Sequence, residues 1–230
     1  MCFSATASFV AGTALSGIGV ATVRNSRDRS ELPLAMIPLL FGVQQLIEGV
    51  IWLTFQYDAP TLKQIATYSY SVFSHVLWPM YIPFAMRSLE FVPWRKQILN
   101  LFQAIGTIVG LYLLFFIVTR PVVAEIDGMH IVRHLVYDSP HFYIIPVMVL
   151  YVAATCVSCF FSSHPFVRLF GVLAFLSFVG TYLFYVRALV SVWCFFAAVL
   201  SLIIYLHLHY RDLGGFPAHG GAHGIRSRST

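Results

Sequence analysis

A glutamate lies inside a long apolar stretch of the chain, LLFGVQQLIEGVIWL. Glu48 follows Gln44 by four residues, so on a helix both side chains would share one face. An ionisable group deep in a membrane costs at least about 2.5 kcal/mol, so the carboxyl group must pair, stay protonated or line water. Intramembrane acids commonly mark ion pathways and reaction sites. We predict a functional role for Glu48, with a structural hydrogen-bonded contact between helices as the alternative.

A histidine occupies the middle of another apolar stretch, YSYSVFSHVLWPMYIP. His75 lies one helical turn after Ser71 and one turn before Pro79. Because proline has no amide hydrogen, Pro79 predicts a kink and an unbonded carbonyl near His75. Counted from the short connection at residues 58–61, His75 and Glu48 would differ in depth by about 9 Å. We expect them to meet only through the kink or through a bridging water.

The longest loop between apolar segments, RPVVAEIDGMHIVRHLVYDSPHFY, contains His130, His134 and His141 together with Asp127 and Asp138. On a helix, His130 and His134 would share a face. Histidine and carboxylate ligands suit zinc, although isoleucine follows His130 where a zinc-protease helix has glutamate. The alternative is an interfacial helix with its polar side chains at the headgroup level. In the first case, His134 and His141 would close a cavity that contains Glu48.

The cysteines divide between the start of the chain and the apolar helices. If Met1 is removed, the amine and thiolate of Cys2 could bind a soft metal or act as a nucleophile. A small buried residue at the start of the first helix is the alternative. Cys156 and Cys159 form a C-x-x-C motif inside an apolar stretch rather than at the start of a βαβ unit. We therefore expect them, like Cys194, to serve packing, with a metal site at the inner face near His164 as the alternative for the C-x-x-C motif.

The composition indicates a membrane protein. Of 230 residues, 59% are hydrophobic and only 10% are charged, whereas soluble domains carry about 25% charged residues. The net charge of +5 therefore indicates membrane topology rather than nucleic-acid binding. Seven apolar segments are each long enough to span about 30 Å of hydrocarbon: 3–23, 32–55, 62–86, 98–118, 142–161, 166–186 and 188–208.

We therefore predict an all-α bundle of about seven transmembrane helices in one domain, residues 1–210, followed by a disordered Gly-rich tail, residues 211–230. Only Arg187 separates the sixth and seventh segments. Small residues recur every fourth position in the first segment, at Ser8, Gly12 and Ser16, and would let a neighbouring helix approach closely.

The basic residues predict the orientation. With the N-terminus outside, ten lie on the inner side: Arg24, Arg27, Arg29, Arg87, Arg95, Lys96, Arg168, Arg211, Arg226 and Arg228. Four lie on the outer side: Lys63, Arg120, Arg133 and Arg187. This bias favours an N-out, C-in protein of the inner (plasma) membrane. Because the first positive charges follow the first apolar segment instead of preceding it, we expect that segment to be a retained helix rather than a signal peptide.

Three blocks, MCFSATASF, IPLLFGVQQLIEGVIWL and FSHVLWPMYIP, resemble a largely uncharacterised family of bacterial multi-pass membrane proteins. The resemblance covers most of the first half of the chain and implies no established activity. It implies that a set of residues belongs to the recurrent pattern of that family: Cys2, Glu48, Trp52, His75 and Trp78.

A second resemblance rests on one motif. Ser71 and His75 form S-x-x-x-H, which is similar to a motif of the seven-helix zinc hydrolases that include alkaline ceramidases and adiponectin receptors. The rest of that pattern differs here. The last apolar segment has H-x-H at His207 and His209 in place of H-x-x-x-H, and no aspartate occupies a matching intramembrane position.

Two classes of function fit these residues. In a metal-dependent membrane-embedded hydrolase of a lipid or an amide, His75, His134 and His141 would hold zinc or another transition metal, and Glu48 would be a ligand or the general base. In a proton- or cation-coupled transporter, channel or sensor, Glu48 and His75 would line the pathway. A non-catalytic subunit of a membrane complex is a third possibility. The expected partners are membrane lipids and a lipid-like or small-molecule substrate, without nucleic acid; an oligomer is compatible with the sequence.

Overall fold

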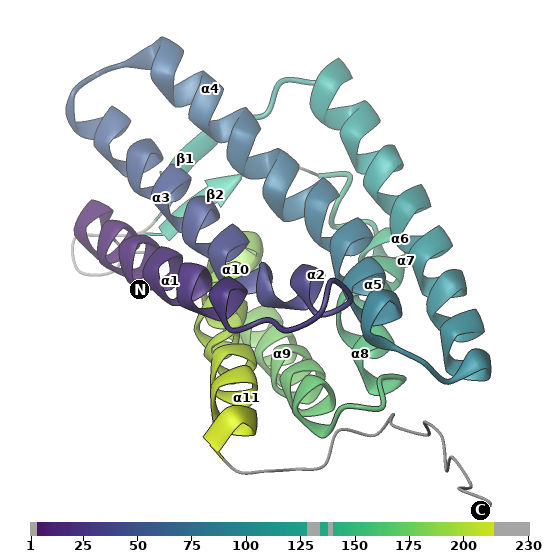
Figure 1. The fold of residues 1–230 in the computed structure, drawn as a ribbon. Coiled ribbons are helices and arrows are strands. Elements are labelled where there is room, and N and C mark those ends of the chain that lie inside the picture. Colours follow the sequence, from purple (N-terminus) through teal and green to yellow (C-terminus); the bar gives the residue numbers. More distant parts are fainter. Residues whose placement is uncertain (1–3, 128–133, 138–139, 214–230) are drawn as a thin grey trace, which may run out of the picture.

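The computed structural model describes residues 4–127, 134–137 and 140–213. It is a bundle of helices with one two-stranded β-hairpin (Figure 1). The elements are α1 (Ala5–Arg24), α2 (Leu32–Ala35), α3 (Ile37–Gln56), α4 (Pro60–Ser71), η1 (Val72–Leu77), α5 (Trp78–Leu89), α6 (Pro93–Thr119), β1 (Ala124–Asp127), β2 (His134–Tyr137), α7 (Ile145–Val152), η2 (Ala153–Val157), α8 (Ser158–Phe160), α9 (Pro165–Phe184), η3 (Val186–Ala188), α10 (Leu189–Leu200) and α11 (Leu202–Leu213).

Five helices of the described chain are long and apolar enough to cross a membrane: Ala5–Arg24, Leu32–Gln56, Pro93–Thr119, Pro165–Phe184 and Val186–His209. Large apolar side chains such as Ile108 and Leu176 are exposed on their outer faces, as contact with lipid requires. The prediction of a helical membrane protein is confirmed at this level. Arg187 lies in η3, where α9 and α10 separate as expected, and α11 extends three residues into the predicted tail.

Two other predicted segments are helices interrupted by π-helical turns. Elements α4, η1 and α5 follow one another without a break from residue 60 to residue 89, and α7, η2 and α8 do so from 145 to 160. Pro79 explains the first interruption, because its ring would clash with the carbonyl of His75 in a regular α-helix and a wider π turn relieves that clash. The irregular turn η1 thus lies directly before Pro79, where the sequence predicted a kink. Turns of this kind often occur at functional sites.

The longest contact between helices joins α1 to α3 (Figure 1). Ser8 and Gly12 are buried in it, as the spacing of small residues predicts. A Cβ atom added at Gly12 would lie 2.8 Å from the Leu46 side chain, and one added at Gly19 would lie 2.5 Å from the Leu39 backbone. Only glycine permits this approach, so the small residues of α1 determine how this helix lies on α3.

Helix α6 packs equally closely on α5. A Cβ atom at Gly106 would lie 1.8 Å from the Pro79 carbonyl oxygen. That oxygen cannot accept the usual α-helical hydrogen bond, because Pro83, four residues later, has no amide hydrogen. Gln103 donates from Nε2 to the neighbouring Met80 carbonyl at 3.1 Å. The close approach therefore places α6 against the proline-containing part of the α4–α5 helix.

The prediction of a helix in the long loop is wrong for the part of the loop that the structure describes. Residues 124–127 and 134–137 form the antiparallel strands β1 and β2, with Asp127 opposite His134. Buried and exposed positions alternate along residues 121–125, which is the period of a strand and not of a helix. Tyr137 stacks on Tyr70 of α4 with ring centroids 4.5 Å apart. The hairpin thus folds against the bundle through its apolar face.

At the opposite end of the bundle, one carboxylate joins two connections. Glu90, between α5 and α6, accepts hydrogen bonds from the backbone amides of Phe91 and Val92. It also accepts from the amide and the hydroxyl of Ser163, in the link between α8 and α9, at 2.8 and 2.9 Å. Burial alone would raise the pKa of Glu90, but these hydrogen bonds stabilise the charged form and lower the pKa below its ordinary value of 4.5.

Candidate functional site

Glu48 is fully buried where α3 meets α10. Its Oε1 atom accepts a hydrogen bond from the Ser191 hydroxyl at 2.5 Å, and its Oε2 atom accepts one from Gln45 Nε2 at 3.2 Å. Gln45 comes from the same helix, whereas Ser191 comes from α10, near the other end of the chain. The carboxylate therefore links α3 to α10 through Ser191, while Gln45 satisfies its other oxygen from within α3.

Gln44, which lies one turn before Glu48 on α3, has a different partner. Its Oε1 atom accepts a hydrogen bond from Trp78 Nε1 at 2.6 Å, and Trp78 also stacks on Phe41 with ring centroids 3.8 Å apart. Residues 44 and 45 point to different neighbours because they lie about 100° apart around the helix. Gln44 connects α3 to α5, while Gln45 serves Glu48.

Several buried polar atoms on α3 and α4 have no hydrogen-bond partner within the described part of the chain. They include Gln44 Nε2, Gln45 Oε1, Trp52 Nε1, Thr67 Oγ1 and Ser71 Oγ. Helices α3 and α4 pack together, although Gln44 also reaches Trp78 of α5 and Gln45 reaches Glu48. Buried polar groups normally find protein or water partners because desolvation is costly. These two helices therefore have unused hydrogen-bonding capacity, including that of Gln45 beside Glu48.

His75 lies in η1, and only 1% of its surface is exposed. Its Nδ1 atom is 2.8 Å from the Ser74 hydroxyl, and that hydroxyl has the Ser71 carbonyl as an acceptor at 3.4 Å. A hydroxyl has one proton, so both contacts are satisfied when Nδ1–H donates to Ser74 and Ser74 donates to Ser71. In this tautomer the lone pair of the imidazole is on Nε2, where it could accept a proton or bind a metal.

A cavity of about 330 Å³ lies beside His75, between the end of α6 and the segment that leads to α7. His141 lines it as well, and its ring stacks on Phe116 with centroids 3.5 Å apart. We call this space the outer cavity; its lining residues are His75, Leu113, Phe116, Ile117, Arg120, Pro121, Val122, Pro140, His141 and Phe142. The structure thus brings together two of the predicted metal ligands. The volume of the outer cavity is within the range of about 300–1,000 Å³ that is usual for ligand sites.

The other predicted site residues are distributed differently. Glu48 does not line the outer cavity, and His134 belongs to β2. Cys2, His130 and Asp138 lie outside the described residues. Among the side chains that the structure describes, no three of the types His, Cys, Asp and Glu gather as a metal would require. Of the residues predicted to share one cavity, His141 lines the outer cavity and Glu48 belongs to a separate network, while the side chain of His134 lies outside what the structure describes.

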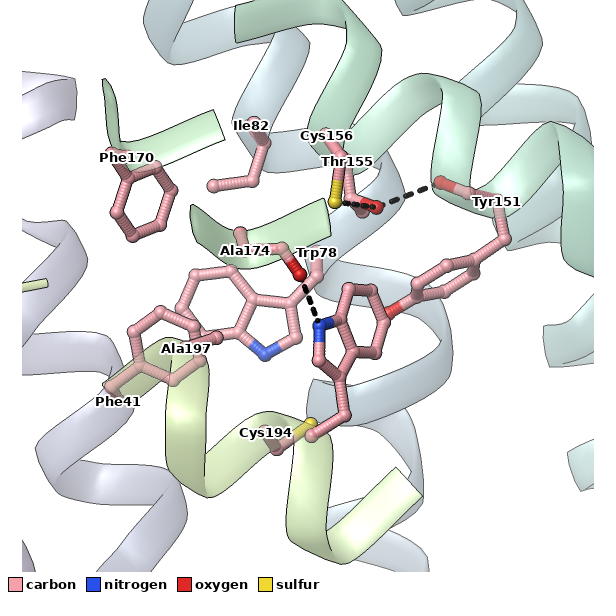
Figure 2. Close-up of a pocket in the computed structure, with 11 residues that line it drawn as sticks. Phe41, Trp78, Ile82, Tyr151, Thr155, Cys156, Phe170, Ala174, Cys194 and Ala197 are labelled. Carbon is pink, nitrogen blue, oxygen red and sulfur yellow. Dashed lines mark hydrogen bonds between the residues drawn. The ribbon is translucent and has the colours of Figure 1, made fainter. Parts of the chain in front are cut away.

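A second cavity, of about 30 Å³, lies deeper in the bundle (Figure 2). Its walls are almost entirely apolar and include the indole rings of Trp78 and Trp193. Trp193 donates to the Ala174 carbonyl at 3.0 Å, so its polar atom is satisfied. Cys156 lines the cavity, and Cys159 is fully buried nearby on the same helical segment. Both thiols are part of the apolar core, in agreement with the packing role predicted for the C-x-x-C motif.

A family model matches residues 1–217, which is almost the whole chain. The chain belongs to the family of unknown function DUF6629. This confirms the expected membership of an uncharacterised family and brings no activity with it. No curated protein and no solved structure matches the chain, so the partial resemblance to seven-helix zinc hydrolases has no counterpart in these comparisons.

Sequence reasoning missed three residues that shape this DUF6629 member. Ser191 is Glu48's partner, Arg120 lines the outer cavity, and Tyr151 donates to the Ser74 carbonyl beside His75. A serine and a tyrosine in apolar helices give no distinctive signal, because such residues commonly bond locally. Arg120 did carry a signal, as the first charge after a long apolar helix, but it was assigned only to topology.

Proposed function

We propose that the chain crosses the plasma membrane seven times, with the N-terminus outside. The five long apolar helices account for five spans. The interrupted helices 60–89 and 145–160 would supply the other two, because their lengths of 30 and 16 residues suit a full span and a short or tilted one. In this arrangement the outer cavity lies at the outer surface and Glu90 at the inner surface.

The function that the geometry favours is a membrane-embedded hydrolase of a lipid-like or amide substrate, with its working site in the outer cavity. One observation carries this proposal: two imidazoles from distant parts of the chain, His75 and His141, line one cavity. Together they would hold zinc or another transition metal, and His134 stays the predicted third ligand. A bound metal would supply an activated water. Glu48 would hold α3 to α10, because both of its oxygens already accept hydrogen bonds.

Elemental analysis of the full chain purified in mild detergent tests this proposal. We expect about one transition metal per chain in the unmodified protein, and its loss in His75→Ala and His141→Ala. His164→Ala is the matched control, because His164 lies before α9 and does not line the outer cavity. An unmodified protein without metal would contradict the metal-dependent hydrolase, as would a metal that all three variants retain.

A second candidate is a proton or cation pathway through Glu48. The unpartnered polar atoms of Gln44, Gln45, Trp52 and Ser71 favour it, because they could bind water or a cation next to the carboxyl group. In liposomes containing a pH-sensitive dye, the unmodified protein would then dissipate an imposed proton gradient and Glu48→Gln would not. Equal rates for the two proteins and for empty liposomes would contradict this candidate.

A further inference from the structure

The ionisable side chains that line the outer cavity are all basic. Arg120, His75 and His141 are its basic residues, and none of the described residues that line it is acidic. The remaining walls are apolar, formed by side chains such as Leu113, Ile117 and Phe142. A purely apolar ligand would leave the guanidinium unused, and a small polar ligand would leave the apolar walls unmatched. The lining therefore fits a molecule with a negative head and an apolar tail.

Arg120 occupies the position from which it can bind such a head. It directly follows the last residue of α6, Thr119, and is exposed, while the helix before it is apolar enough to span a membrane. In that position the side chain lies where lipid headgroups are found. Guanidinium groups bind phosphate and carboxylate oxygens through paired N–H donors. The apolar walls continue from Arg120 toward the interior through Ile117 and Leu113, one and two turns back along α6.

We propose that the outer cavity binds a membrane amphiphile with an anionic phosphate headgroup. Arg120 is the headgroup anchor, and the apolar wall of α6 holds the start of the tail. This inference rests on the proposed function in one respect: both place the working site in the outer cavity. It adds the class of substrate that this site would bind. It does not depend on a metal, because the anchor is a residue of the chain itself.

Native mass spectrometry of the full chain in detergent tests the inference directly. The probes are lysophosphatidic acid, lysophosphatidylcholine with the same acyl chain, and inorganic phosphate. We expect lysophosphatidic acid to bind about tenfold more tightly than lysophosphatidylcholine, because its phosphomonoester offers the guanidinium an additional free anionic oxygen, whereas in lysophosphatidylcholine that oxygen carries a choline cation. Arg120→Gln should abolish this preference, and Arg120→Lys should restore part of it. Lys63→Gln should retain it, because Lys63 lies over the Phe55 ring and does not line the cavity.

Equal binding of the two lipids by the unmodified protein would overturn the inference, as would an unchanged preference in Arg120→Gln. Inorganic phosphate that displaces lysophosphatidic acid at comparable concentration would also overturn it, by identifying a site for the free anion. Metal analysis of the same samples separates the two proposals. A lipid preference without metal supports the anchor and contradicts the metal-dependent hydrolase; metal without a lipid preference does the reverse.

Discussion

At the scale of single residues, the most distinctive feature is a buried carboxylate whose two oxygens each accept a hydrogen bond. The sequence marked Glu48 correctly as a residue that needs partners, because its depth in an apolar segment is readable from the chain alone. It did not identify the partners. Ser191 lies 143 residues away, and only the packing of α10 on α3 brings it to Glu48. Long-range contacts of this kind leave no local pattern.

Glu48→Gln should destabilise the fold. The amide that replaces one carboxylate oxygen is a donor, and it would face a donor from Gln45 or Ser191. We expect a loss of about 1–3 kcal/mol, typical of a buried group that loses its partner, measured as a lower midpoint of thermal unfolding in detergent. Ser191→Ala should produce a smaller loss in the same direction.

Ser177→Ala is the control for these two variants, because the Ser177 hydroxyl bonds only within its own helix, to the Ala174 carbonyl at 2.8 Å. Its midpoint should stay near that of the unmodified protein. If Glu48→Gln and Ser177→Ala had equal midpoints, the hydrogen bonds of Glu48 would not stabilise the bundle.

At the scale of elements, prolines and glycines decide how the helices meet. Pro79 predicted an irregular helix, and η1 is that irregularity. The consequence for packing was not predictable, because it depends on Gly106 of α6 lying against the Pro79 carbonyl. The hairpin was missed for a different reason. The spacing of His130 and His134 suggested a helix, whereas residues 124–127 and 134–137 pair as strands, and burial alternates along residues 121–125 with the period of a strand.

Gly106→Ala should separate α6 from α5. The added methyl group would overlap the Pro79 carbonyl, since the two atoms would be 1.8 Å apart. Overpacking against the backbone costs about 1–3 kcal/mol or more, so we expect a clearly lower unfolding midpoint. Gly180→Ala is the matched control on α9, where nothing lies within 4 Å of the added atom. A Gly106→Ala protein as stable as Gly180→Ala would show that α6 does not pack as described.

Glu90 should make the stability of the link between α5 and α6 depend on pH. Because its pKa in the folded protein is below 4.5, its contribution is complete above the unfolded value and is lost as the pH falls through the folded value. At about pH 7, Glu90→Gln should be less stable than the unmodified protein by about 1–3 kcal/mol. This difference should shrink steadily in unfolding experiments below about pH 4.5. A difference that is constant down to pH 3 would contradict the role of the charged carboxylate.

At the scale of the whole molecule, composition alone was enough to predict a helical membrane protein, because too few charges are present to cover a soluble surface. Length and hydropathy also located the helices closely. They did not give the number of crossings, since only five helices are long and apolar enough by themselves and two others are interrupted. The relation between the ends of the chain was likewise invisible, although α11 contacts α1.

The proposed orientation predicts which loops face the outside. Asp58, between α3 and α4, should lie outside, and Phe91, between α5 and α6, should lie inside. In intact cells, a membrane-impermeant maleimide should label the Asp58→Cys variant and leave Phe91→Cys unlabelled until the membrane is opened. Both variants should be made in a Cys2→Ser protein, because the proposed orientation places Cys2 outside, where the reagent would label it. Cys156, Cys159 and Cys194 are buried, so they should add little background, and Cys2→Ser alone measures what remains. The reverse labelling pattern would place the N-terminus inside.

The central claim is that His75 and His141 act together in the outer cavity, and X-ray absorption at the edge of the bound metal tests it most directly. The account predicts nitrogen neighbours at about 2.0–2.1 Å with the outer-shell pattern of at least two imidazoles. This pattern should lose one imidazole, or the metal altogether, in both His75→Ala and His141→Ala, and it should be unchanged in His164→Ala. A metal without imidazole ligands, or a spectrum that neither cavity variant alters, would contradict the claim.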